Sequence, residues 1–200
     1  MNRRRLPFAA LAAAVAILTV AVLLWARTSP VPAGPLAGSG VGGAFALVDQ
    51  DGRAVTHRTY AGKWRLMYFG YTFCPDVCPV DVQKIAQGMK AFAHDDPARA
   101  AKVVPIFVTV DPERDTPAVL KTFVRAFSPT MVGLTGTPAQ AEAARKAFRV
   151  YAKKAGTGRD YLVDHTAITY LMDPANQPVS FLDHGATPQA IAAELKTYVR

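Results

Sequence analysis

Cysteine is scarce in this sequence. Its 200 residues contain only Cys74 and Cys78, which are four positions apart and each followed by proline. Two thiolates do not complete a metal site, so a metal bound here needs a further ligand from elsewhere in the chain. A bridge between the two closes so short a loop that it constrains the unfolded chain little, which disfavours a purely structural disulfide. The pair is therefore placed for chemistry, either redox exchange or metal binding.

Blocks of lysine and arginine are also missing. The net charge is +8, but four arginines and no acidic residue lie in residues 1–30, which leaves 19 basic against 15 acidic residues in the rest of the chain. This remaining excess of basic residues is small and is spread along the sequence, so nucleic-acid binding is not expected. No internal repeat is visible, and half of the residues are hydrophobic, which argues against disorder over the whole chain.

One long segment has no charged residue at all. Leu6–Trp25 is twenty residues long, about the length of a membrane-spanning helix, and follows Arg3, Arg4 and Arg5. The positive-inside rule then places the N-terminus in the cytoplasm and the rest of the chain across the membrane. A cleaved signal peptide is the alternative, but its apolar region would be unusually long and a clear cleavage site is missing. We predict that residues 1–27 are an uncleaved, single-pass anchor in the cytoplasmic (inner) membrane, with an extracytoplasmic, periplasmic domain.

The rest of the chain alternates strand-like and helix-like patterns. Residues 28–43 are rich in proline, glycine and serine and are expected to form a flexible linker, followed by one domain over residues 44–200. The order of elements predicts an α/β fold with a mostly parallel centre, which resembles a thioredoxin-like fold with an N-terminal β-hairpin and an inserted helix. The strands are expected at residues 44–48, 54–56, 65–70, 102–110, 131–134, 166–172 and 179–182, and the helices at 79–94, 117–127, 138–148 and 188–200.

The two cysteines lie in the turn between a buried strand and a helix. The positive end of a helix dipole stabilises a thiolate, so we expect the pKa of a cysteine placed there to be lowered. The four-residue spacing lets both sulfurs face one point, either as a disulfide or as two metal ligands. Asp76, between the cysteines, either tunes their redox potential, takes part in docking or caps the backbone N–H groups of the loop. Asp111 and Asp115 either lie near the site or, as their positions favour, belong to a loop before the next helix, which Asp115 or Thr116 can cap.

Histidine is the candidate third ligand, and His165 has the best position. We expect it at the start of a late strand, and in a thioredoxin-like sheet the loop before that strand approaches the cysteines. Together with Cys74 and Cys78 it gives two sulfurs and one nitrogen, which suits Cu(I), or Cu(II) or zinc with an added ligand. The other histidines lie in loops or at a helix end and have no such position: His57, His94 and His184.

Four segments together resemble the Sco/SenC family, and the likeness covers residues 44–200. They are GYTFCPDVCP (70–79), VDPERDTP (110–117), GLTG (133–136) and VDHT (163–166). The resemblance implies a membrane-tethered, thioredoxin-like domain that binds one copper through two cysteines and one histidine, which map onto Cys74, Cys78 and His165. It also implies a role in assembling the binuclear copper centre of cytochrome c oxidase subunit II, by delivering copper, by reducing the cysteines of that subunit, or by both.

Two functions stay open at this point. The first is a copper chaperone, not an enzyme in the turnover sense, with subunit II as its partner and an upstream periplasmic copper chaperone and a thiol reductant as further candidate partners. The second is a thiol–disulfide oxidoreductase or thiol peroxidase that acts on that subunit or on other extracytoplasmic proteins through a redox-active disulfide of Cys74 and Cys78. Dedicated oxidoreductases usually carry C-x-x-C and a proline near the site, where this chain has three intervening residues and Asp164-His165-Thr166. The copper chaperone is therefore favoured.

Overall fold

The computed structural model describes residues 11–21 and 33–200, which belong to two separate compact units. Residues 11–21 form a helix whose side chains are exposed. The predicted membrane span, Leu6–Trp25, extends on both sides into residues outside the described ranges. Within those ranges, no helix has the length and apolar character needed to cross a membrane.

The second compact unit runs from Ala33 to Val199 and begins earlier than the sequence predicted. Part of the predicted linker already contacts the domain: the Leu36 N–H donates to Val179 O (3.1 Å), the Gly42 N–H donates to Ala147 O (2.9 Å), and Val41 is buried. Proline and glycine in this stretch form turns that pack on the domain, and such turns have the same composition as a linker.

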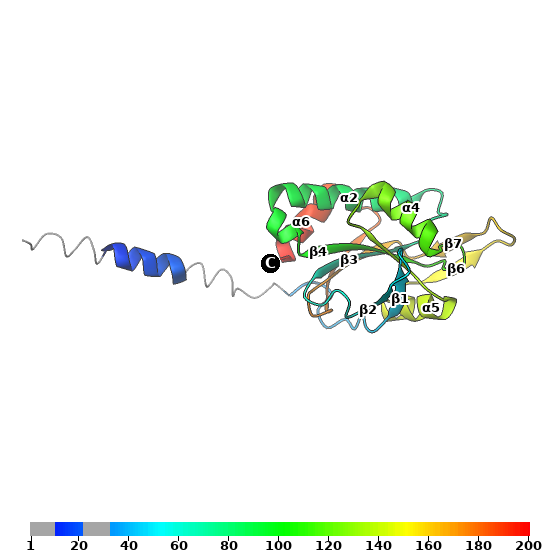
Figure 1. Cartoon of the computed structure of the whole chain (residues 1–200), viewed down its shortest axis with the longest axis horizontal. Coiled ribbons are helices and arrows are strands. Elements are labelled where there is room, and N and C mark those ends of the chain that lie inside the picture. Colours follow the sequence, from blue (N-terminus) through cyan, green and yellow to red (C-terminus); the bar gives the residue numbers. More distant parts are fainter. Residues whose placement is uncertain (1–10, 22–32) are drawn as a thin grey trace, which may run out of the picture. The chain divides into compact units, whose positions relative to one another are not determined.

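A seven-stranded mixed sheet forms the centre of this unit (Figure 1). Its strand order is β2-β1-β5-β4-β3-β8-β9; β3, β4 and β5 are parallel, and the remaining pairs are antiparallel. The strands are β1 (Ala46–Asp49), β2 (Ala54–Thr56), β3 (Trp64–Gly70), β4 (Val103–Thr109), β5 (Val132–Thr135), β8 (Ile168–Met172) and β9 (Pro178–Asp183).

Helices cover both faces of the sheet, with α2, α4 and α6 on one side and α5 on the other (Figure 1). They are α2 (Val77–Asp95), the short α3 (Pro97–Ala100), α4 (Pro117–Phe127), α5 (Pro138–Ala147) and α6 (Pro188–Tyr198). Three of them begin as the sequence predicts, because Thr116, Thr137 and Thr187 each accept a backbone N–H and precede a proline. With helices on both faces, all seven residues of the central strand β3 are buried.

A second, two-stranded sheet corrects one prediction. The sequence predicts no strand between residues 149 and 165, but β6 (Ala152–Ala155) pairs antiparallel with β7 (Leu162–His165). The sequence of β6, AKKA, is mostly exposed and has no alternation of apolar residues that would signal a strand. His165 consequently ends β7 and does not begin the next strand, which starts at Ile168.

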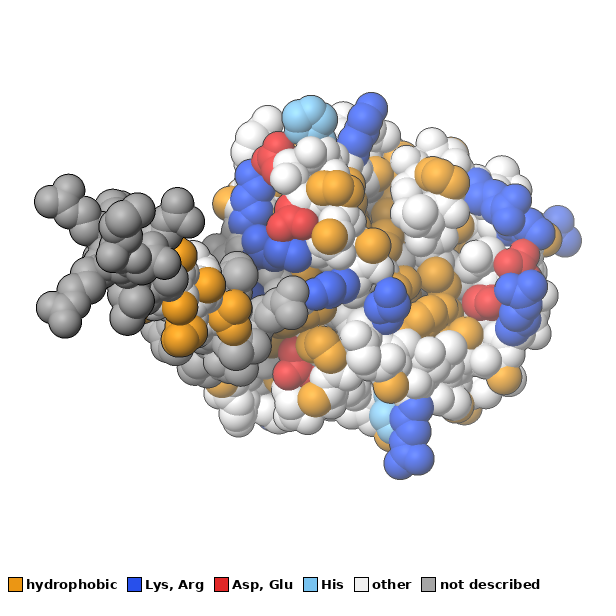
Figure 2. Space-filling model, turned by 60° about the vertical axis from the view of Figure 1, so that its left-hand side comes forward, with side chains coloured by type: hydrophobic (Ala, Val, Ile, Leu, Met, Phe, Trp, Pro, Cys, Tyr) orange, Lys and Arg blue, Asp and Glu red, His pale blue; other side chains and the backbone are white. Residues whose placement is uncertain are grey.

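The surface of the domain carries its charges in a dispersed way. On the face seen in Figure 2, lysine and arginine side chains are scattered, and several lie beside acidic ones. Ion pairs of this kind join Lys121 to Asp51 (2.8 Å) and Lys146 to Glu142 (2.8 Å). The scatter follows the even spread of charged residues along the sequence.

Candidate metal centre

The cysteine loop connects β3 to α2. Because α2 begins at Val77, two residues earlier than predicted, Cys78 lies within its first turn and not just before the helix. Cys78 is completely buried and Cys74 is half-buried, and both are free thiols. The backbone N–H of Cys78 lies 3.4 Å from the Cys74 sulfur and donates to it. The Cys74 sulfur therefore occupies the N-terminal end of the helix, where backbone N–H groups have no partner within the helix.

Gly70, the last residue of β3, leaves the space that the Cys78 sulfur occupies. A Cβ atom at this position would lie 2.9 Å from Cys78 Sγ and 2.7 Å from Cε1 of Tyr68. Both distances are too short for a real side chain, so the close approach of the helix to the strand requires glycine here. Gly70 is the first residue of the motif GYTFCPDVCP, but the sequence of the motif does not reveal this role.

His165 reaches the same sulfur from the end of β7. Its Nε2 lies 3.4 Å from Cys78 Sγ, and its Nδ1 lies 3.2 Å from Thr166 O. A carbonyl oxygen can only accept, so the second contact is a hydrogen bond when Nδ1 carries the hydrogen, and the lone pair of Nε2 then faces the sulfur. Burial lowers the pKa of His165, so the ring is neutral at pH 7, which is the state in which imidazole binds metals.

The thiol of Cys78 differs from the expectation for a helix N-terminus. Burial raises its pKa to about 12. The predicted lowering is therefore wrong for Cys78, because the sulfur is fully removed from water and the lost hydration of the thiolate outweighs the helix dipole. A thiolate at this position needs a compensating charge, and a metal ion is one source of it.

The structure does not gather the three predicted ligands into one closed site. Over residues 11–21 and 33–200, no three or more His, Cys, Asp or Glu side chains are grouped closely enough to hold a metal ion. The structure brings Cys78 and His165 together, while the sulfur of Cys74 contacts the Cys78 backbone. The full set of three ligands stays a prediction.

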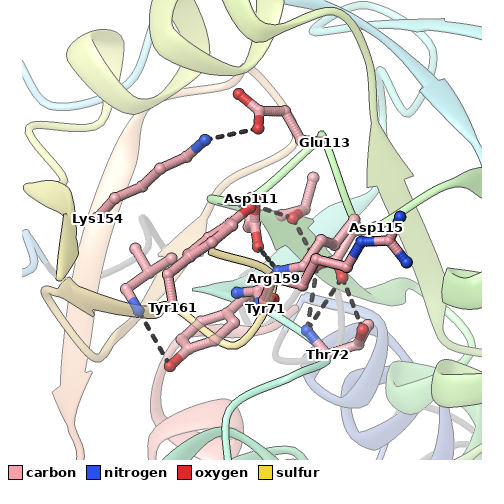
Figure 3. A network of polar contacts seen from close by, with 11 residues as sticks. Tyr71, Thr72, Asp111, Glu113, Asp115, Lys154, Arg159 and Tyr161 are labelled. Atoms are coloured by element: carbon pink, nitrogen blue, oxygen red, sulfur yellow. Dashed lines mark hydrogen bonds and ion pairs between the residues drawn. The ribbon is translucent and has the colours of Figure 1, made fainter. Parts of the chain in front are cut away.

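Asp115 fixes the start of the cysteine loop (Figure 3). Its carboxylate accepts hydrogen bonds from the Thr72 N–H (3.1 Å), the Thr72 hydroxyl (2.6 Å) and the Thr109 hydroxyl (2.6 Å). Burial raises the pKa of Asp115, although these hydrogen bonds oppose the effect. The sequence suggested Asp115 or Thr116 as a helix cap; Thr116 is the cap, and Asp115 instead ties the cysteine loop to the end of β4. Asp76 makes no capping hydrogen bond at the start of α2.

Arg114 lies among three aromatic rings beside the site. Its guanidinium carbon is 3.7 Å from the ring centroid of Tyr161, 4.8 Å from that of Phe73 and 5.7 Å from that of Tyr71. The carboxylate of Asp111 accepts hydrogen bonds from Arg114 Nε (2.5 Å) and from the Tyr161 hydroxyl (2.7 Å), and so it holds the guanidinium beside the ring of Tyr161. These contacts connect the loop after β4, the cysteine loop and the segment that leads into β7.

Two further contacts hold the β6–β7 hairpin in place (Figure 3). Lys154 pairs with Glu113 (2.6 Å), and the hydroxyl of Tyr71 accepts the N–H of Val163 (3.2 Å). The ring of Tyr71 also packs edge-on against His165, with centroids 5.7 Å apart. Tyr71 therefore positions the histidine both through the backbone of β7 and through its ring, and its place in the motif GYTFCPDVCP does not reveal either role.

The remaining histidines have other partners. His184 Nδ1 lies 2.9 Å from the carboxylate of Asp81, His94 is exposed beside Asp95, and His57 packs edge-on against Phe45. None of these contacts involves Cys74 or Cys78. Of the four histidines, His165 is the one that the structure places against a cysteine sulfur.

Comparison with known proteins identifies the family. Residues 34–200 match the family model described as SCO1/SenC. Protein SenC of Rhodobacter capsulatus is 45% identical over 153 residues, which cover 76% of this chain and 67% of that protein. The chain spans a smaller share, 51% and 53%, of the mitochondrial SCO1 homologues of Arabidopsis thaliana and Homo sapiens.

Solved structures agree with this result. Bradyrhizobium japonicum ScoI with copper bound is 46% identical, with a TM-score of 0.72, over 80% of this chain and 99% of that one. BsSco, a member of the Sco family of cytochrome c oxidase assembly proteins for which a disulfide switch is described, is 26% identical, with a TM-score of 0.60, over 82% and 95% of the two chains. The predicted mixed α/β, thioredoxin-like fold is confirmed, and the chain belongs to the SCO1/SenC family.

Proposed function

We propose that this protein is a copper chaperone that binds one copper ion through Cys74, Cys78 and His165 and helps to assemble the binuclear copper centre of cytochrome c oxidase subunit II. The observation that carries the proposal is the contact between Cys78 Sγ and His165 Nε2. A soft sulfur beside a neutral imidazole nitrogen is a ligand pair that suits copper. Copper bound to the related ScoI, and the description of BsSco as an oxidase assembly protein, support the proposal.

The donor set fits copper as a cargo that is taken up and passed on. His165 offers Nε2 in the correct tautomer, because Thr166 O holds the hydrogen on Nδ1. Cys78 offers its sulfur from the first turn of α2, and half-buried Cys74 lies in the loop before the helix, where its sulfur accepts the N–H of Cys78. Uptake requires both cysteines in the reduced form and releases their protons, so copper binding is coupled to the redox state of the pair.

The proposal includes a membrane location. Leu6–Trp25 would anchor the chain in the cytoplasmic membrane, and the domain would face the periplasm, where subunit II, a copper donor and a thiol reductant are accessible. The uncharged length of this segment and the arginines before it support the anchor. Recovery of the full chain in the membrane fraction after carbonate washing is the expected result, and its release into the supernatant contradicts the anchor.

Copper titration of the reduced full chain tests the site. The wild-type chain is expected to take up about one Cu(I), and His165→Ala is expected to lower the affinity at least about tenfold. His94→Ala is the matched control, because His94 is exposed on α2 and should leave the affinity unchanged. Uptake well below one ion by the wild type, or equal affinity in His165→Ala, contradicts the proposed site.

A thiol–disulfide reductase is the second candidate function. It is favoured by the arrangement of the two thiols, because half-buried Cys74 accepts an N–H at the helix N-terminus while Cys78 lies buried behind it. In such a pair the more accessible thiol attacks a partner disulfide and the buried one resolves the mixed disulfide. Full rescue of oxidase assembly by His165→Ala, with both cysteines intact, would favour this function over copper delivery.

A further inference from the structure

Arg65 is a buried arginine near the start of the central strand β3, at the opposite end from the cysteine loop. It is 1% exposed. At about 3.3 Å per residue, it lies about 17 Å along the strand from Gly70. Burying a guanidinium is costly unless a negative charge compensates it, because the group loses its hydration and stays protonated in proteins. The proposed copper site gives Arg65 no role, so this buried charge needs another explanation.

The hydrogen-bond acceptors around this guanidinium are neutral. Its Nη1 donates to the backbone oxygen of His57 (3.2 Å) and to the side-chain oxygen of Asn176 (2.6 Å), and its Nη2 donates to the backbone oxygen of Asp173. Its Nε is buried and has no hydrogen-bond partner among the described residues. Burial lowers the pKa of Arg65, and the charge of Asp173 counters part of this effect. The carboxylate of Asp173 itself accepts the N–H of Gln177 (2.7 Å), so the positive charge is only partly compensated.

Arg65 lines a hollow of about 430 Å³, a size typical of sites for small molecules. Two more basic residues line this Arg65 hollow. They are Arg58, which is exposed and whose guanidinium has no partner within the described residues, and His57, whose Nδ1 is buried without one. Asn176 and Gln177 contribute amide groups. Within residues 33–200 no acidic side chain lines the hollow, and its other lining residues are Gly43, Ala44, Ala61, Pro174 and Ala175.

We propose that the Arg65 hollow is a second binding site, which takes a small soluble molecule with a phosphate or carboxylate group. Guanidinium groups bind both of these oxyanions. Arg58 and the amide of Gln177 are the donors that a ligand reaches directly, because both side chains are exposed, while buried Arg65 adds positive charge from the core. A bound anion connects the turn after β2 to the turn between β8 and β9, so its binding stabilises the folded domain. The inference does not rest on the proposed copper function.

Calorimetric titration of the metal-free full chain in detergent solution tests the site, with inorganic phosphate and, separately, with succinate at constant ionic strength. We expect saturable binding of at least one of the two anions, with a dissociation constant below about 1 mM. Arg58→Gln should weaken this binding at least about tenfold. Arg53→Gln is the matched control, because Arg53 is an exposed arginine at the other end of β2 that pairs with Asp51 and does not line the hollow. Binding of neither anion, unchanged binding in Arg58→Gln, or equal weakening in both variants overturns the inference.

A second variant separates anion binding from the structural hydrogen bonds of Arg65. Arg65→Met removes both the charge and the bonds to the β8–β9 turn, so lower stability alone fits either role. The measurement is the shift of the thermal midpoint on adding the bound anion at about ten times its dissociation constant. We expect this shift to be at least about threefold smaller in Arg65→Met than in the wild type and in Arg53→Gln. Equal shifts overturn the inference, and if Arg65→Met does not fold, the Arg58→Gln titration decides it.

Discussion

The imidazole of His165 meets the sulfur of Cys78 across 87 positions of the sequence, with Nε2 3.4 Å from Sγ. The two residues belong to different parts of the fold, since Cys78 lies in the first turn of α2 and His165 ends the hairpin strand β7. The hairpin is held to the rest of the domain by side chains around Arg114, Tyr161 and Tyr71. A copper site that uses both residues therefore depends on these contacts as much as on the ligands.

Arg114→Lys is expected to loosen the hairpin while the fold persists. Lysine keeps the charge but loses the planar group that stacks on Tyr161 and binds Asp111, and its loss should cost about 0.5–1 kcal/mol of stability. Copper affinity should fall roughly tenfold, because His165 is no longer held against Cys78. Hydrogen exchange of the hairpin amides should become faster. Arg125→Lys, on the exposed side of α4, is the control, and equal exchange in both variants contradicts the role given to Arg114.

Thr72→Val tests the clamp at the start of the cysteine loop. The substitution keeps the shape of the side chain but removes the hydroxyl that donates to buried Asp115 at 2.6 Å. The carboxylate is then less well satisfied, and we expect the free energy of unfolding to fall by about 1–3 kcal/mol in urea titrations. Thr72→Ser keeps the donor and should recover most of this loss. Equal stability of the two variants would show that the hydrogen bond is not what holds the loop.

Much of the fold was predictable because its signals are local. The buried strands β3 and β4 are mostly apolar, and a threonine followed by a proline marks the start of each of the helices α4, α5 and α6. The β6–β7 hairpin was missed because pairing of Ala152 with His165 brings together residues whose own sequences carry no strand pattern. That pairing is set by contacts with distant loops, which a local pattern does not contain.

The site was predictable as a set of residue types but not as an environment. The spacing of Cys74 and Cys78 and the position of His165 predicted which residues to consider, and the structure places two of the three in contact. The raised pKa of Cys78 was not predictable, because it follows from burial beneath Gly70 and Tyr68. Burial of a single sulfur is decided by the packing of a helix on a strand. The helix dipole, considered alone, predicted a lowered pKa for Cys78, which is the wrong direction.

Gly70→Ala tests that packing. The added methyl group would lie 2.9 Å from Cys78 Sγ and 2.7 Å from Tyr68, so the helix or the ring must shift. Overpacking of this kind costs about 1–3 kcal/mol of stability, and displacement of the sulfur should lower copper affinity at least about tenfold. Gly185→Ala is the control, because Gly185 is exposed and its added methyl meets only the side chain of Asp183 at 3.3 Å. Unchanged copper affinity in Gly70→Ala contradicts the close packing of Cys78 on β3.

The raised pKa of Cys78 predicts a loss of stability in alkaline solution. The folded chain keeps its proton up to about pH 12, whereas an ordinary cysteine in the unfolded chain loses it near its usual value of 9.0. Between these values the unfolded state binds fewer protons, so its ionisation favours unfolding, and the free energy of unfolding falls as the pH rises. The stability that depends on this thiol is fully present below about pH 9, and about 1 kcal/mol of it should be lost by pH 10.

Urea titrations of the reduced, metal-free chain at several values between about pH 8 and pH 10 measure this dependence. The fall in the free energy of unfolding with rising pH should be less steep in Cys78→Ala, because this variant has no thiol to titrate at this position. The variant is expected to be less stable than the wild type at every pH. Cys74→Ala is the matched control and should keep most of the slope, because Cys78 remains buried in it. Identical slopes in the wild type and in Cys78→Ala would mean that the thiol of Cys78 ionises as readily in the folded domain as in the unfolded chain.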